Sequence, residues 1–99
     1  MDNLTQQKEH YSFALKPKNV HIKDNTCAYK GDDRTMHRNV IFNPAFPESP
    51  ANEYPKVHHV ACRDCGLQFK ISISNTEINI WEESNYQDLT EFGVPERNK

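Results

Sequence analysis

The residues of this sequence best suited to chemistry are two cysteines, Cys62 and Cys65, in the stretch HVACRDCGLQF. A glycine, Gly66, directly follows the second cysteine. A Cys-x2-Cys-Gly turn can aim two sulfur atoms at one point, because glycine lets the backbone turn tightly. Two thiolates at this spacing are typical of one half of a tetrahedral zinc site. We therefore predict that this pair binds a structural Zn²⁺.

The other ligands of the predicted site must come from elsewhere in the chain. Cys27 is the one cysteine left of three, so we expect it to be the third ligand. A histidine would then complete a Cys3His set. His37 is the first choice, since a hairpin loop at residues 31–33 would place it directly opposite Cys27, at a distance that suits two ligands of one metal.

Other ligands and other chemistries stay open. A turn at residues 23–25 would instead place His21 opposite Cys27, and His59 stands three residues before Cys62. Cys27 could also be a small buried apolar residue, and the cysteine pair could be a redox dithiol. The redox motif opens a helix, whereas a strand-like run follows the pair here, which favours the metal.

Strands must position these ligands, and the clearest ones follow the cysteine pair. The runs LQFKISIS and TEINIW alternate between apolar and polar residues, which predicts strands with one buried face. A two-residue turn at residues 75–76 would pair Ile73 with Ile78 and Ile71 with Ile80 on that face. Trp81 would lie on the other face, where we expect it to pack under a terminal segment.

The remaining pattern predicts strands and turns over residues 19–42, with strands at 26–30 and 34–42. Residues 43–56 carry four of the six prolines and should form a loop. The polar residues 83–99 should be a loosely ordered tail. We therefore expect a small β-rich fold, β or α+β, in a single domain of residues 1–99 with its core at 19–82.

The stretch CRDCGLQF and the hairpin after it resemble the second half of a zinc ribbon, over residues 57–82. In that family two ligand pairs, carried on turns of antiparallel hairpins, clamp one zinc. Cys62 and Cys65 match the second of these turns. The first half departs from the family, because it has no second Cys-x2-Cys. The resemblance implies hairpins around one structural zinc, and zinc ribbons are frequent in the transcription and translation machinery.

Composition limits the classes of function. The 99 residues have a net charge of −2, so the overall field does not favour nucleic acid. The N-terminus lacks a basic start followed by an apolar run, from which we expect a cytoplasmic protein without a membrane span. A closed four-ligand site has no open position for water, and we assign no catalytic residue. A small metal-dependent hydrolase stays as an alternative, for which His58 is the residue to test.

The surface favours a protein partner. The proline-rich loop displays Phe46 and Tyr54, which are typical interface anchors. Plentiful Asn, Lys, Ile and Glu are typical of AT-rich genomes such as those of many phages. These features lead to the hypothesis of a viral modulator or inhibitor of a host enzyme or of the transcription machinery. A nucleic-acid-binding zinc ribbon is the alternative, because basic residues gather in the first half of the chain.

Overall fold

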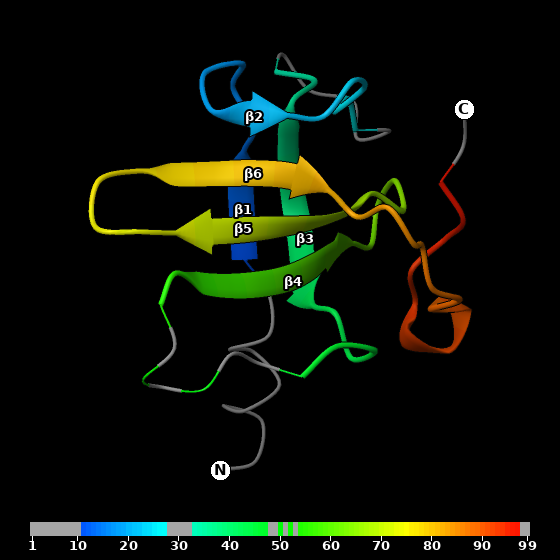
Figure 1. The fold of residues 1–99 in the computed structure, drawn as a ribbon. Coiled ribbons are helices and arrows are strands. Elements are labelled where there is room, and N and C mark those ends of the chain that lie inside the picture. Colours follow the sequence, from blue (N-terminus) through cyan, green and yellow to red (C-terminus); the bar gives the residue numbers. More distant parts are fainter. Residues whose placement is uncertain (1–10, 28–32, 48–49, 51, 53, 98–99) are drawn as a thin grey trace, which may run out of the picture.

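The computed structural model describes residues 11–27, 33–47, 50, 52 and 54–97. In these residues six strands form one sheet with the order β1-β3-β4-β5-β6-β2 (Figure 1). A short 3-10 helix, η1 (Thr90–Phe92), follows the last strand, and no helix of the described part is long and apolar enough to cross a membrane. The strands are β1 (Tyr11–Ala14), β2 (Val20–His21), β3 (Met36–Phe42), β4 (Lys56–Cys62), β5 (Gln68–Ile73) and β6 (Ile78–Glu82).

The predicted small β-rich domain is confirmed, but its sheet is mixed. Antiparallel pairing joins β1 to β3 and links β3, β4, β5 and β6 in succession. Strand β2 instead pairs with β6 in parallel, with Val20 beside Ile80 and His21 beside Trp81. Antiparallel hairpins alone therefore do not describe this sheet, since its last pair joins segments far apart in the sequence.

The predicted hairpin is present as β5 and β6. Ile73 pairs with Ile78 and Ile71 with Ile80, as the alternation of apolar residues predicts. The backbone N–H of Ser74 donates to the carbonyl of Glu77 at 2.9 Å, which closes the two-residue turn. Local pattern and turn length therefore fixed the same register.

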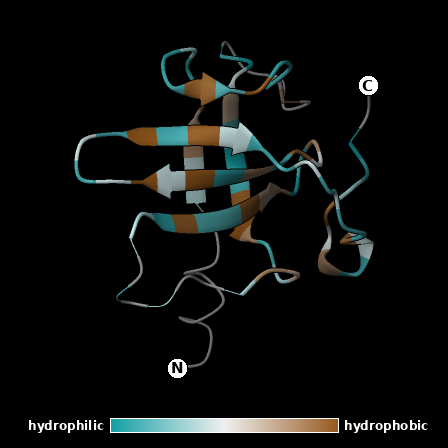
Figure 2. Ribbon diagram, in the orientation of Figure 1, coloured by the Kyte–Doolittle hydropathy of each residue, from teal (hydrophilic) through white to brown (hydrophobic). Residues whose placement is uncertain are grey.

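The sheet curls so that its first strand crosses behind its middle strands (Figure 1). The ring of Phe13 on β1 meets Phe69 on β5 edge-on, with centroids 6.3 Å apart. Leu15, directly after β1, is fully buried in the same interior. The inner face of the curl therefore holds the main core, and brown apolar positions alternate with teal or white ones along β5 and β6 in Figure 2.

A second, smaller core lies on the outer face of the sheet. Leu89 and Val94, which are 3% and 2% exposed, cluster there with Ile41 and Ala61. The buried core therefore extends beyond residues 19–82 at both ends, to Leu15 and to the segment expected to be a loose tail. Although that segment is mostly polar, its few apolar side chains pack against the outer face of the sheet.

Two further expectations meet different outcomes. Within the described residues, Trp81 does not pack under a terminal segment: it is 42% exposed, and its ring stacks on His21 at 4.0 Å between centroids. The parallel partner β2 supplies this contact, which alternation along β6 does not reveal. The strand predicted at residues 26–30 lies mostly outside the described residues, and Thr26 and Cys27 themselves are not in a strand.

Candidate metal centre

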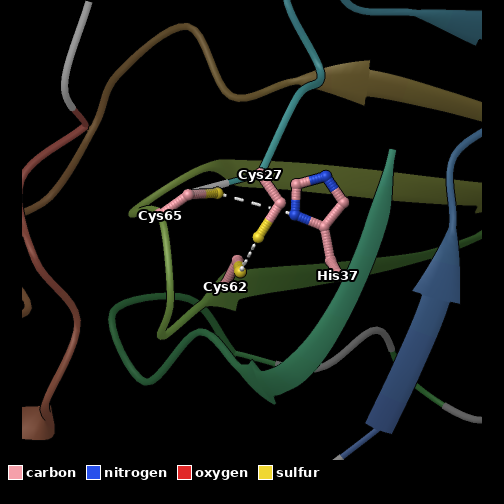
Figure 3. A group of neighbouring side chains, drawn as sticks. All are labelled: Cys27, His37, Cys62 and Cys65. Carbon is pink, nitrogen blue, oxygen red and sulfur yellow. Dashed lines mark hydrogen bonds between the residues drawn. The ribbon is translucent and has the colours of Figure 1, made fainter. Parts of the chain in front are cut away.

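Four buried side chains meet at one end of the inner core: Cys27, His37, Cys62 and Cys65. Each offers one ligand atom, and these four atoms all lie within 4.8 Å of one another. None of the four side chains is more than 7% exposed. In Figure 3 they come from a loop, from strand β3, and from the end of β4 with the turn that follows it. The structure thus brings together all four residues that the sequence predicted as ligands.

Cys62 ends β4, and Cys65 lies in the turn that leads to β5. The backbone N–H of Gly66 donates to the carbonyl of Cys62 at 2.9 Å, and the N–H of Asp64 points at the Cys62 sulfur at 3.4 Å. Gly66 has a φ of 82°, which side chains with a Cβ rarely adopt. The glycine in the motif therefore has the conformational role expected from the sequence.

A bulge in the pairing of β1 with β3 places His37 in the site. Tyr11 pairs with Val40 and Phe13 with His37. The paired residues are therefore two positions apart on β1 but three positions apart on β3. In a regular strand, residues three apart would point to opposite faces. The extra residue turns both His37 and Val40 inward, where each is fully buried.

The expected reason for choosing His37 was different from the observed one. The strand residue opposite His37 is Phe13, not Cys27. Cys27 approaches from a loop, and its backbone N–H donates to the carbonyl of Arg34 at 2.7 Å. Most of the predicted hairpin loop at residues 31–33 lies outside the described residues.

Two of the separations between donor atoms match a tetrahedral zinc shell. A Zn–S bond of about 2.3 Å sets two sulfurs about 3.8 Å apart, and a sulfur and a nitrogen about 3.6 Å apart. The Cys27 and Cys62 sulfurs are 3.8 Å apart, and the Cys65 sulfur is 3.5 Å from Nδ1 of His37 (Figure 3). Two opposite edges of the tetrahedron therefore already have the required length.

The ring of His37 is held in the orientation that a metal ligand needs. Its Nε2 lies 2.8 Å from the backbone carbonyl of Asn25, which can only accept a hydrogen bond. Nε2 must therefore carry the proton, and in the neutral ring the lone pair is on Nδ1, which faces the cysteines. A backbone carbonyl that fixes the tautomer in this way is a common outer partner of ligating histidines.

The thiols of Cys62 and Cys65 differ in how readily they lose a proton. The hydrogen bond from Cys62 lowers the pKa of Cys65 to about 4, and the contact with His37 adds to this effect. The same hydrogen bond, together with burial, raises the pKa of Cys62. These contacts therefore favour the thiolate form of Cys65, which is the form that binds metals.

The other histidines of the described chain do not join the four donors. His21 stacks on Trp81, and Nδ1 of His59 pairs with Oε1 of Glu83 at 2.8 Å. His58 lies on the inner face of β4, in an apolar recess with Val60 and Ile71. The alternatives His21 and His59 are therefore not placed to be the fourth ligand.

Sequence reasoning missed the residues that support the ligands. Asn25 acts through its backbone carbonyl, and its side-chain Nδ2 also donates to the carbonyl of Leu15 at 2.8 Å. Arg97 reaches the same loop from the far end of the chain, with its Nη1 3.0 Å from the carbonyl of Thr26. Neither contact has a local sequence signal, since both depend on which segments the fold places side by side.

Comparison of the chain with protein-family models, with curated proteins and with solved structures finds no match. No fold neighbour therefore supports the zinc-ribbon topology, and the resemblance stays confined to the turn with Cys62 and Cys65. The Cys3His cluster is the feature from which a function can be argued.

Proposed function

We propose that this chain is a zinc-binding protein in which Cys27, His37, Cys62 and Cys65 hold one structural Zn²⁺. The observation that carries the proposal is the cluster itself, four buried donor atoms within 4.8 Å of one another. Three sulfurs and one imidazole nitrogen are the donors that zinc prefers in structural sites. Four protein donors also fill a tetrahedral shell, which leaves no position for a reacting water.

Zinc would stabilise the fold because its ligands come from segments that are distant in sequence. Structural zinc contributes on the order of 10 kcal/mol to the folding of small domains near neutral pH. A chain of 99 residues with a mean hydropathy of −0.91 has a small apolar core to rely on. The metal would join the loop of Cys27 and strand β3 to the β4–β5 turn.

Metal content and circular dichroism test this proposal together. We expect one zinc per chain by native mass spectrometry, and loss of the β signal when a chelator removes the metal. Cys62→Ser should lower zinc occupancy and stability, whereas His58→Ala, which changes a histidine outside the cluster, should keep the zinc. A purified chain that carries no metal and stays folded in chelator would contradict the proposal.

We further propose that this zinc-stabilised fold acts by binding a protein partner through an apolar recess of the curled sheet. This recess has a volume of about 390 Å³ and is lined by side chains of β1, β3, β4, β5 and β6. Its mouth exposes large apolar side chains, with Tyr11 38%, Phe42 37% and Ile78 51% exposed. Such a lining fits apolar side chains of a protein better than phosphates or sugars.

A photo-crosslinking amino acid at position 42 tests the recess as a binding site. We expect a discrete protein adduct from this position in the producing cell, and its loss when Ile78→Glu places a charge at the mouth. The control position is Tyr54, which is 53% exposed and does not line the recess. The same adducts from both positions, or an adduct insensitive to Ile78→Glu, would argue against the recess.

A further inference from the structure

Arg97 forms hydrogen bonds to the loop that carries Cys27. The same loop contacts His37 through the carbonyl of Asn25. Nη2 of Arg97 donates to the carbonyl of Asp24 at 2.6 Å, and its Nη1 donates to the carbonyl of Thr26 at 3.0 Å. The carboxylate of Asp24 lies 3.8 Å from the same guanidinium group, and the Arg97 side chain is only 8% exposed. The two carbonyls flank Asn25, and the carbonyl of Thr26 directly precedes Cys27, so one side chain fixes the backbone on both sides of Asn25.

The segment around Arg97 also lies against the turn with Cys62 and Cys65. We call residues 93–97 the C-terminal strap. A Cβ placed on Gly66 would lie 2.2 Å from the carbonyl oxygen of Pro95 and 2.9 Å from the backbone nitrogen of Arg97. Val94 anchors the strap, since it is 2% exposed in the outer core. The strap thus bridges the β4–β5 turn and the loop of Cys27.

An open polar recess lies between these two ligand-bearing segments. It has a volume of about 470 Å³, and its lining includes Cys27 and Cys65 together with Pro95, Glu96 and Arg97 of the strap. The recess therefore brings solvent close to two of the four candidate ligands, beside the strap. The position of the strap decides how far the two ligand-bearing segments can separate.

We propose that Arg97 is a positioning residue for the metal centre and that the C-terminal strap controls metal release. Arg97 holds the carbonyls of Asp24 and Thr26, and this holds the carbonyl of Asn25 against Nε2 of His37. The histidine then presents Nδ1 to the cysteines. This inference rests on the proposed zinc site. It adds a residue that would not bind the metal itself but would hold its ligands in place, although Arg97 lies 70 residues after Cys27 in the sequence.

The test compares zinc release from the full-length wild type with release from Arg97→Gln, using a chromogenic chelator in excess. We expect zinc loss at least about tenfold faster in the variant, because losing an outer partner typically costs 10- to 100-fold in metal affinity. Arg97→Lys should be intermediate, since one ammonium group cannot serve both carbonyls with the planar fork of arginine. Lys23→Gln is the matched control, because it removes one exposed positive charge just before the same loop.

A second readout separates positioning of His37 from a general loss of stability. In zinc-loaded wild type, nitrogen NMR should show metal-bound Nδ1 and a slowly exchanging proton on Nε2 of His37. In Arg97→Gln that proton should exchange faster, while circular dichroism at saturating zinc stays unchanged. A chain that ends at Glu96 should behave like Arg97→Gln, and a chain that ends at Arg97 should behave like wild type.

The outcomes distinguish the two proposals. If wild type binds zinc and Arg97→Gln releases it as slowly as Lys23→Gln does, the role of Arg97 is overturned and the zinc site stands. If wild type binds no zinc, the zinc site and the strap mechanism fall together. If faster release comes without any change at Nε2 of His37, the strap acts only as a cover and the positioning role is overturned.

Discussion

At the scale of single residues, buried polar side chains on the outer face satisfy one another. Gln68 is 3% exposed, and its Oε1 accepts hydrogen bonds from Nδ2 of Asn43 at 3.2 Å and from the backbone N–H of Gln87 at 3.0 Å. Its Nε2 donates to the carbonyl of Gln87 at 2.8 Å. Because an unpaired buried polar group is costly, these bonds tie the segment after β6 to the sheet.

Tyr86 makes a related contact that can be followed by pH titration. Its hydroxyl donates to Oε2 of Glu82 at 2.8 Å. Burial, and then this hydrogen bond to a carboxylate, raise the pKa of Tyr86. The fold therefore favours the neutral phenol. This stabilisation is complete below the unfolded-state pKa of about 10 and is lost as the pH rises above it.

We expect ultraviolet titration of the four tyrosines to show one late ionisation step, well above the normal pKa, that coincides with alkaline unfolding. The late step should disappear in Tyr86→Phe. It should persist in Tyr54→Phe, because the Tyr54 side chain is 53% exposed. A late step that survives in Tyr86→Phe would assign the raised pKa to another tyrosine.

At the scale of elements, predictability followed the sequence distance between partners. The hairpin of β5 and β6 could be predicted because its two strands are adjacent, and alternation and turn length select the same register. The parallel pair of β2 with β6 could not, since Val20 and Ile80 are brought together only when the sheet curls. The exposed stack of Trp81 on His21 depends on that pair and was missed with it.

The predictability of the candidate metal ligands also follows sequence distance. Cys62 and Cys65 are readable from spacing, and Cys27 follows as the remaining thiol of the chain. His37 was selected by an assumed hairpin with Cys27, whereas a bulge against β1 turns its ring inward. Bulges leave no trace in the alternation of a short strand, so the sequence identified this candidate ligand without the structural cause of its position.

At the scale of the whole molecule, apolar side chains pack on both faces of the sheet, and the two clusters have different origins. The inner face holds the main core, with the four donors at one end and the apolar recess at the other. The outer face of β3 and β4 is covered by the segment around η1. In Figure 1 this C-terminal segment runs beside the β4–β5 turn, which bears Cys65. The residues after β6 therefore link the outer core to the strap.

This arrangement predicts that Leu89 is a structural residue. Leu89→Ala should lower the free energy of unfolding by about 2–5 kcal/mol, because it removes a buried side chain that packs with Ile41 and Ala61. Phe92→Ala is the control in the same segment: its side chain is 41% exposed, and we expect a change within about 0.5 kcal/mol. Urea unfolding at saturating zinc measures both, so that metal binding contributes equally. Equal stability of the two variants would mean that the segment after β6 adds no stability and is the loose tail that its polarity suggests.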